Sequence, residues 1–570
     1  MAAASAGCVA NLRNLVGRRR TEQLSLTVAT MPEADDPYAV RIANRLAENM
    51  QAAGIDAIVD PMTPDVLYRE ILINHDFDLY VARYPSAGDP DELYSLLHSA
   101  YGEEGGWQNP FGYSDLELDE QLEDQRSADH IERQELFHQI LERVVREQPF
   151  TTIAFPDRIA GVRTERFDRW PIGGLDDPAD YLTLERVDEE AETIELLLRD
   201  ARITRNRNPI AAEHRDPSDV AGLLYEPLAR DLGQEEPTPW LAREVEWDQV
   251  DGDLAATVRL RDTPWHDGEP LSASDVAFTY EFLVDTSLGE FESPVPTTWR
   301  RGRLSIVEWV DARSHDSVRF RFSVPRHDVA WRALSVPILP QHVWEERSEA
   351  ADIGPLNIAG QTTVALVDPN EEATGSGPVR FQDATEDEEI VLEAFEDHFL
   401  ETGDTEGIPP RYADGVPFER ARFLVTPSHD AAMTLLEGGE ADGTADGLNA
   451  SVVPRIGRSP DIQLTIGRSN AFYHVGYNCR AAPLTDPRFR QALSRLLDRD
   501  VIVDQSFDGY AVPTEVPLRS QWVPDALTWD GVGTHPFAGT NGDLDVETAR
   551  ESFREAGYQY EEGELVRRAN

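Results

Sequence analysis

A histidine and an aspartate stand side by side in the motif Trp265-His266-Asp267-Gly268. An aspartate that orients a histidine is the arrangement of the general base in many hydrolases. Such a site also needs a nucleophile beside the base, and the surrounding sequence does not set one there. Asp-Gly is, in addition, a turn signal between a strand and a helix. We therefore interpret the motif as a turn, predict no catalytic residues, and keep a hydrolase only as the least favoured alternative.

Residues that bind metals are scattered along the chain. The thirteen histidines show neither HxxxH nor HExxH spacing, and the two cysteines, Cys8 and Cys479, form no CxxC motif. We expect no metal site in the protein itself, no disulfide framework and no cofactor. A metal chelated by a bound ligand remains open.

The segment Tyr84–Asp91, YPSAGDPD, is the most informative binding candidate. It follows the apolar run FDLYVARY, and the loop at the carboxyl end of such a strand is where an α/β sheet presents its ligand contacts. We select Tyr84, Ser86 and Asp89 as ligand-binding residues. The alternative is structural, because Asp89-Pro90-Asp91 is typical of a helix start with an Asp cap and Pro in the first turn.

A Gly-rich loop supplies two further candidates, Trp107 and Asn109. A tryptophan in such a loop has little local packing reason and is suited to cover a ligand. The alternative is that Trp107 packs against helices of its own domain and contributes to the core. For Arg490, farther along the chain, an internal ion pair is favoured over a ligand contact.

Charge is the strongest compositional feature. The 570 residues include 106 acidic and 52 basic ones, the net charge is −54, and the sequence has no lysine. Self-repulsion of this size destabilises a compact chain at ordinary ionic strength, whereas molar salt shortens the Debye length to about 3 Å. We interpret the composition as halophilic adaptation. An acidic surface for one basic partner is less favoured because the acids are spread along the chain, and a nucleic-acid partner would need a basic face.

The elements that must position the candidate loops alternate between strand and helix. After a tail to about Gln23, LSLTVAT is typical of a strand, residues 37–53 of an amphipathic helix closed by Gly54, and IDAIVDPM and FDLYVARY of further strands. This alternation predicts parallel pairing in an α/β fold.

A strand, a Pro-rich loop and a helix are also expected in the segment Phe472–Arg499. Alternating Tyr473, Val475 and Tyr477 indicate a half-buried strand. Either Thr485 or Asp486 can cap the amphipathic helix that follows.

This segment, FYHVGYNCRAAPLTDPRFRQALSRLLDR, resembles the signature of family 5 extracellular solute-binding proteins, the dipeptide, oligopeptide and nickel receptors of ABC importers. LLYEPLAR, VRLRDTPWHDGEPLSASDVAFTYEFL and GSGPVRF resemble earlier blocks of the same family. The resemblance implies a two-lobe α/β fold of the periplasmic-binding-protein type, in its large type II peptide-receptor class, without enzymatic activity. It also implies that Tyr225 and Tyr473 face the cleft, with core packing as the alternative for both.

The resemblance bears on the ligand as well. In peptide receptors of this family, an aspartate three residues before the DPD triplet pairs with the free ammonium group of the ligand. This chain has Ser86 at that position, and a serine offers only a neutral hydrogen bond. Recognition of a peptide amino terminus would therefore require Asp89 or another acid to take over.

The family blocks stand in a rotated order. The opening third of the chain, from LSLTVATMPEADDPYAV to PFTTIAFPDRIAGV, resembles the family's C-terminal part, and from about Thr193 the chain resembles its N-terminal part. We interpret this as a circular permutation, with a gene model spliced from two neighbouring receptors as the alternative. The predicted organisation is a flexible tail at 1–23, lobe I at 149–393, and lobe II assembled from 24–148 and 394–570. Leu24–Thr30 should then share a lobe with Phe472–Tyr477.

Near the start of the sequence, Cys8 ends the run SAGC, which looks like a lipobox, although Met1–Gly7 are too few for the charged and apolar regions of a signal peptide. Either the true start lies upstream or the match is accidental, and Cys8 is a candidate lipidation residue. No stretch reaches the roughly 18 apolar residues of a membrane span.

We therefore predict a monomeric extracytoplasmic receptor, associated with the cell surface, that captures a peptide-like or other small solute. Its partners would be ABC permease subunits, with membrane contact only through a lipid anchor. A sensor or chaperone with the same fold is the alternative.

Overall fold

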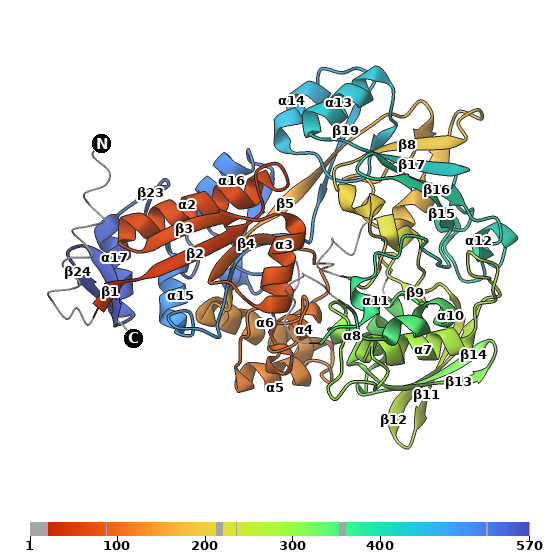
Figure 1. Cartoon of the computed structure of the whole chain (residues 1–570), viewed down its shortest axis with the longest axis horizontal. Helices are drawn as coiled ribbons and strands as arrows, with labels where there is room; N and C mark the ends of the chain where they lie inside the picture. Colours follow the sequence, from red (N-terminus) through yellow and green to blue (C-terminus); the bar gives the residue numbers. More distant parts are fainter. Residues whose placement is uncertain are drawn as a thin grey trace.

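Two lobes face each other in the computed structural model, which describes residues 21–86, 88–211, 220–234, 236–352, 361–519 and 522–568 (Figure 1). The two ends of the chain, coloured red to orange and blue, build the terminal lobe (residues 21–156 and 470–568). The middle of the chain, yellow to cyan, builds the middle lobe (residues 157–469). Cys8 lies outside the described residues. Along the described ranges, none of the helices is both long and apolar enough to cross a membrane.

The terminal lobe is a three-layer α/β structure. Its main sheet is built from β2 (Ser25–Thr30), β3 (Asp56–Pro61), β4 (Leu79–Tyr84), β20 (Phe472–Tyr477), β21 (Ala511–Pro513) and the first half of β5 (Phe150–Val162). Its helices include α2 (Pro37–Ala53), α3 (Pro64–Tyr68), α4 (Glu92–Leu97), α5 (Leu116–Asp124), α6 (His130–Glu147), α15 (Pro487–Ser494), α16 (Arg499–Ser506) and α17 (Val546–Glu555). The sheet runs in the order β5-β20-β4-β2-β3, and β2 pairs in parallel with both β3 and β4, as predicted.

Helices cover both faces of this sheet. Alternate residues of β2, β4 and β20 enter two different cores, one shared with α2, α15, α16 and α17 and the other with α5 and α6. All six residues of β20 are buried, so the prediction of a half-buried strand is wrong. Tyr473 and Val475 point to one face of the sheet, and Phe472 and His474 point to the other. Both faces are covered by helices, so the alternation distinguishes two buried faces and not a buried face from a solvent-exposed one.

Two predicted helices appear where their end signals place them. Helix α2 begins after Asp36, whose carboxylate accepts hydrogen bonds from the amides of Tyr38 and Ala39, and ends at Gly54 in the left-handed conformation. Of the two cap candidates for α15, Asp486 provides the cap, accepting from the amide of Arg488. Local capping chemistry therefore determines both helices.

The middle lobe has two parts that share one large core, and a smaller separate core lies within the first part. The first part contains β8 (Thr193–Leu198), β15 (Val379–Thr385), β16 (Glu389–Ala394), β17 (Arg420–Val425), β18 (Gly443–Thr444), β19 (Gln463–Arg468), α13 (His429–Gly438) and α14 (Val453–Ile456). The second contains β11 (Ala242–Val250), β12 (Asp253–Leu260), β13 (Val307–Ser314), β14 (Ser317–Phe322), α7 (Ala273–Val284), α8 (Arg301–Leu304), the 3-10 helix η7 (Trp331–Ser335) and α10 (Gln341–Trp344).

Strand β5 passes from one lobe to the other. Its residues up to Pro156 pair with β20 and β21 of the terminal lobe, and its residues from Asp157 onward pair with β19 of the middle lobe. The return connection is the short segment 469–471 between β19 and β20. Two neighbouring connections between lobes are the arrangement of a hinge.

The expected lobe boundary at 393/394 needs correction. That position lies at the end of β16, which pairs with β17, and β17 pairs in turn with β8 inside the middle lobe. Phe423, well beyond the expected boundary, belongs to the same core as Phe167. Because strands in one sheet share backbone hydrogen bonds, the middle lobe continues to β19.

The two ends of the described chain lie together. Strand β1 (Thr21–Gln23) pairs antiparallel with β25 (Glu564–Arg568), with Thr21 opposite Arg568. Strands β2 and β20 lie in one sheet with β4 between them, so the prediction that Leu24–Thr30 shares a lobe with Phe472–Tyr477 is confirmed.

Candidate functional site

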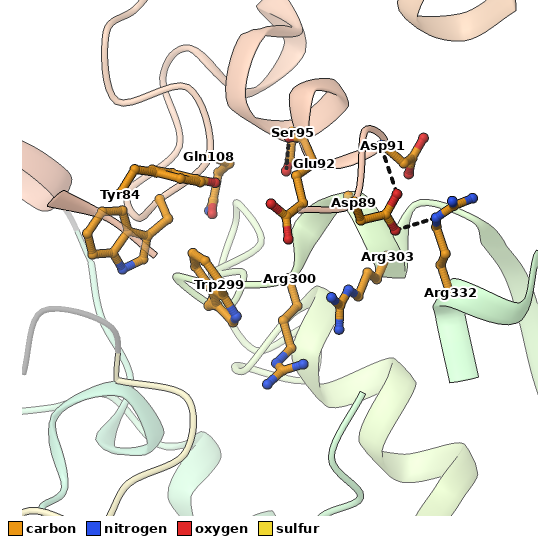
Figure 2. Close-up of a pocket in the computed structure, with 12 residues that line it drawn as sticks. Tyr84, Asp89, Asp91, Glu92, Ser95, Gln108, Trp299, Arg300, Arg303 and Arg332 are labelled. Atoms are coloured by element: carbon orange, nitrogen blue, oxygen red, sulfur yellow. Dashed lines mark hydrogen bonds and ion pairs between the residues drawn. The ribbon is translucent and has the colours of Figure 1, made fainter. Parts of the chain in front are cut away.

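A cavity lies between the two lobes and receives side chains from both (Figure 2). The terminal lobe lines it with Tyr84, Asp89, Asp91, Glu92, Ser95, Trp107 and Gln108, and the middle lobe with Trp299, Arg300, Gly302, Arg303 and Arg332. Its water-accessible volume is about 40 Å³, which is room for about three water molecules. The lobes are therefore closed on each other, and a larger solute enters this space only when they separate.

The acidic wall is positioned by the end of β4 and the start of α4. Sheet pairing fixes Tyr84, the loop turns, and α4 then begins at Glu92. Within the loop, Asp89 accepts a hydrogen bond from the amide of Asp91 at 3.0 Å. Ser86 donates its hydroxyl proton to Glu92 Oε2 at 2.7 Å. In Figure 2 the Glu92 carboxylate extends from α4 toward the Trp299 and Arg300 side.

An aromatic wall adjoins the acidic one. Trp107 packs edge-on against Tyr84 at 5.6 Å and against Trp299 of the other lobe at 5.8 Å between ring centroids. Tyr84 also stacks on Phe472 of β20. Burial, with a smaller effect from the charge of Glu92, raises the pKa of Tyr84 well above its ordinary value, so its hydroxyl stays protonated. These rings offer an apolar surface that can hold a flat or hydrocarbon group.

The middle lobe supplies a basic wall. Arg332 forms an ion pair with Asp89 across the cavity. Arg300 and Arg303 instead converge on Ser335, Arg300 Nη1 donating to its carbonyl at 3.2 Å and Arg303 Nη1 to its hydroxyl at 2.9 Å. Burial lowers the pKa of Arg300 to about 9, and the neighbouring positive charges of Arg303 and Arg230 act in the same direction.

Direct bonds seal the lobes around the cavity. Arg126 holds Asp91 within the terminal lobe and also donates to Gly302 O at 2.9 Å and Ser305 Oγ at 3.0 Å in the middle lobe. Burial, the largest single effect, raises the pKa of Asp91, but the charge and hydrogen bonds of Arg126 together with Arg332 and Gln125 lower it below its ordinary value. The amide of Trp107 donates to Thr298 O at 2.9 Å.

A second ion pair, from Arg301 to Glu104 at 2.8 and 2.9 Å, completes this contact. Bonds of this kind compensate for the solvent that closure removes, so the closed state is specific rather than a loose encounter.

Of the seven residues predicted to bind ligand, the structure brings three to the cavity wall: Tyr84, Asp89 and Trp107. Ser86 lies just behind the wall, where it holds Glu92. Asn109 does not line the cavity, because its amide braces its own loop, donating to His98 O and Tyr113 O and accepting from the amide of Tyr113.

Both tyrosines expected in the cleft lie in cores instead. Tyr225 is buried in the middle lobe and its hydroxyl accepts from Asn370 Nδ2 at 2.7 Å. Tyr473 is buried in β20, and its hydroxyl hydrogen-bonds to the Asp36 carboxylate, 3.1 Å from each of the two oxygens. Neither residue lines the cavity between the lobes.

The His-Asp pair serves the fold. His266 donates from Nε2 to Gly377 O at 3.0 Å and accepts at Nδ1 from the amide of Gly375 at 3.2 Å. Asp267 bonds to His342 at 2.7 Å rather than to its neighbour. The motif is thus the predicted turn, fastened to the loop 375–377.

Arg490 does not line the cavity. In place of the predicted ion pair, its guanidinium donates to the carbonyls of Glu147, Gln148 and Leu484. Within the part of the chain that the structure describes, no group of three or more His, Cys, Asp or Glu side chains is arranged to hold a metal ion.

Sequence reasoning missed the middle-lobe wall and Glu92. A local signal existed for part of it, since Trp299-Arg300-Arg301-Gly302-Arg303 places an aromatic residue beside three positive charges in an acidic chain. Arg332 carried no such signal, because its partner Asp89 lies 243 positions away.

Comparison with known proteins places these features in a family. The model described as "Bacterial extracellular solute-binding proteins, family 5 Middle" matches residues 236–569. The chain is 26% identical over 307 residues to the oligopeptide-binding protein AppA of Bacillus subtilis strain 168, covering 53% of this chain and 49% of that protein. The matched part thus spans about half the length of this curated relative.

Solved structures are similar at a lower level. AppA from Bacillus subtilis in complex with a nonapeptide has a TM-score of 0.46 and 21% identity, with 66% of each chain covered. NikZ from Campylobacter jejuni in complex with Ni(L-His) has a TM-score of 0.43 and 19% identity, again with 66% of each chain covered.

Proposed function

Because this chain belongs to the family 5 extracellular solute-binding proteins, we propose that it is the receptor of an ABC importer and captures a small, peptide-like solute between its lobes. The observation that carries this proposal is the cavity between the lobes, whose wall is shared by Tyr84, Asp89 and Trp107 on one side and Trp299, Arg300 and Arg332 on the other. A site divided in this way is complete only when the lobes are closed. Closure can therefore report occupancy to a permease.

The proposed mechanism is a shift of population. An open form exposes both walls, the solute binds one, and its additional contacts with the other favour closure by the difference in affinity between the two forms. We propose that the chain bends at residues 156–157 and 469–471 when the lobes close. At these positions β5 and the link from β19 to β20 pass between the lobes. The protein would act outside the cytoplasmic membrane and transfer the solute to permease subunits.

The acidic wall suits a ligand with a positive group. Asp89 is already paired with Arg332. Glu92 lines the cavity and is held by Ser86 at 2.7 Å. We assign to Glu92 the carboxylate that Ser86 cannot provide, so a free ammonium group remains compatible with this site.

The order of the chain supports a second proposal, that the protein is a circular permutant of its family. The family model matches from residue 236 onward, while residues 25–84 supply β2, β3 and β4 to the sheet that β20 shares. On this proposal the terminal lobe is completed by the first part of the chain, and the lobe assignments are 24–156 with 470–568, and 157–469.

Ligand identification tests the function. The protein is purified natively in molar KCl, denatured, and the released small molecules are identified by mass spectrometry. A stoichiometric solute whose re-addition lowers the radius of gyration in small-angle X-ray scattering is the expected result. A protein whose lobe separation is unaffected by every released or added solute would contradict capture by closure.

A further inference from the structure

One asparagine of the middle lobe belongs to the tripeptide Asn-X-Ser/Thr, which is the acceptor of N-linked sugars. It is Asn449, in Asn449-Ala450-Ser451, and none of the other fourteen asparagines of the sequence has a serine or threonine two positions later. The middle residue is alanine and not proline, as the acceptor motif requires. Because such a tripeptide also arises by chance, its setting in the structure decides whether it can be modified.

The Asn449 side chain lies at the surface and is not used by the fold. Asn449 has an extended backbone, φ −84° and ψ 163°, and precedes the 3-10 helix η10 (Ala450–Val452), yet its side chain makes no capping bond. The exposed Ser451 donates its hydroxyl proton to Asn449 Oδ1 at 2.5 Å. Among the residues with described side chains, Asn449 Nδ2 donates to no group, and it is not buried. The amide nitrogen therefore faces solvent, while the hydroxyl fixes the opposite side of the carboxamide.

The turn that carries the tripeptide is held from beneath. The amide of Leu448 donates to Ile159 O of β5 at 2.7 Å, and Leu448, Ala450 and Val452 are buried in one small core. The amide of Ala450 donates at 3.3 Å to the hydroxyl of Tyr38, which lies on α2 of the terminal lobe. Helix η10 leads directly into α14, at the upper edge of the middle lobe in Figure 1. These contacts use backbone groups and apolar side chains, so the carboxamide and hydroxyl of the tripeptide remain accessible to an enzyme.

We propose that Asn449 is a site of N-glycosylation. The co-reactant is an oligosaccharide carried on a lipid phosphate, and a separate transferase recognises the hydroxyl of Ser451. Asn449 Nδ2 forms a bond to the anomeric carbon of the first sugar. The bond from that carbon to the phosphate oxygen breaks, the lipid phosphate leaves with the electron pair, and the amide nitrogen loses one proton.

This inference rests on the extracytoplasmic location in the proposed function, because the glycosylation acceptor motif applies to proteins on that side of the membrane. The site itself is separate from solute capture, since Asn449 does not line the cavity between the lobes. A bulky, hydrated glycan at this turn projects into solvent. We therefore expect glycosylated and unglycosylated protein to bind the same solute equally well.

Mass spectrometry of the protein from the cells that make it tests the site. Surface and cytoplasmic fractions are separated, and the whole protein from each is digested with trypsin. The peptide spanning residues 423–455 contains Asn449 and no other asparagine. Electron-transfer fragmentation of this peptide locates any modified residue. We expect a mass increment of several sugar units on Asn449 in the surface fraction.

Matched variants made in the same cells separate the tripeptide from its surroundings. Asn449→Gln and Ser451→Ala should each abolish the mass increment, whereas Ser451→Thr should keep it, because threonine retains the hydroxyl. Tyr38→Phe is the control, since it removes the hydrogen bond between the lobes and leaves the tripeptide intact. Asn541, which is exposed but followed two positions later by Asp543, should carry no sugar in the unchanged protein.

The possible failures can be told apart. Surface protein with an unmodified Asn449 would overturn the glycosylation site and leave solute capture intact. A sugar on the peptide that survives both Asn449→Gln and Ser451→Ala would also overturn it. Protein confined to the cytoplasm would overturn both the extracytoplasmic receptor and this site. A glycosylated Asn449 in a protein that captures no solute would support the site and contradict the proposed function.

Discussion

Asp89 of the terminal lobe and Arg332 of the middle lobe form an ion pair across the cavity, and both side chains are largely shielded from solvent. Asp89 also accepts from the amide of Asp91 at 3.0 Å, so its carboxylate is fixed in the direction of the other lobe. The pair therefore acts on the equilibrium between open and closed forms more than on the fold of either lobe.

The first prediction concerns this pair. Asp89→Asn keeps the shape of the side chain and removes the charge, so the closed form should lose about 1 kcal/mol, or about fivefold in population. Small-angle X-ray scattering of the ligand-free protein should show a larger radius of gyration. Asp248→Asn, which breaks a pair with Arg319 on an exposed sheet, is the control. Equal radii for both variants and the unchanged protein would contradict the interpretation.

A substitution at Gly106 tests closure in a second way. It has φ +120°, and a Cβ at this position would lie 2.3 Å from Thr298 O of the other lobe. Gly106→Ala should therefore hold the lobes apart and weaken ligand binding by at least about tenfold, because the backbone contact between the loops cannot form. Gly289→Ala is the matched control, since that glycine also has positive φ, +82°, but nothing within 4 Å of its added Cβ. If both variants closed equally well on ligand, the close approach at Gly106 would not matter.

Acidification tests the contribution of His266 to the free energy of unfolding. Burial lowers its pKa from 6.5 to about 4, so the unfolded chain binds more protons between these values and the free energy of unfolding falls as the pH drops through this window. The stabilisation is fully present above pH 6.5. Between pH 7 and pH 5 the free energy of unfolding of the unchanged protein should fall. In His266→Gln this fall should be smaller by about 1–2 kcal/mol, because glutamine does not take up a proton in this range. Urea unfolding at constant KCl measures the free energy of unfolding at each pH. If its dependence on pH were the same in the variant and the unchanged protein, His266 would not contribute to acid destabilisation.

Local chemistry was readable in the sequence, and long-range pairing was not. Helix α2 was predicted to its ends because its apolar stripe and Gly54 lie within it or beside it, and the structure adds the cap at Asp36. The boundary at 393/394 was misplaced because the parallel pairing of β17 with β8 joins residues more than two hundred positions apart. Asn109 was chosen for its loop, but its hydrogen bonds inside that loop depend on turn geometry that the sequence alone does not reveal.

The cavity residues also divide into those that a local sequence pattern indicates and those that only long-range contacts bring together. Tyr84, Asp89 and Trp107 could be selected because the end of an apolar strand and a Gly-rich loop mark ligand contacts locally. Arg300, Arg303 and Arg332 reach them only when the middle lobe closes, so no pattern within the loop 84–91 indicates them.

Salt should control the stability of the whole protein. With a net charge of −54, repulsion among carboxylates is screened over about 10 Å at 0.1 M salt but over about 3 Å at 1 M. We expect the thermal midpoint to rise steeply between 0.1 M and 3 M KCl, followed by circular dichroism. Sucrose at equal osmolality is the control, because it favours compact states without screening charge. A midpoint independent of KCl would contradict halophilic adaptation.

Relinking the chain tests the proposed permutation. Thr21 lies opposite Arg568 in an antiparallel pair, so a linker of roughly two to five residues should join them as a hairpin. New ends can be opened in the exposed turn at Glu189–Glu190, just before β8, which restores the block order of the family. Since every strand keeps its partners, the relinked protein should melt within about 5 °C of the original in molar KCl and retain the same solute. The control is the same relinked chain opened between Val28 and Ala29, in the buried centre of β2, which should not fold. If the chain opened at Glu189 behaved like this control, the family order would not be compatible with this fold, and the permutation would be refuted.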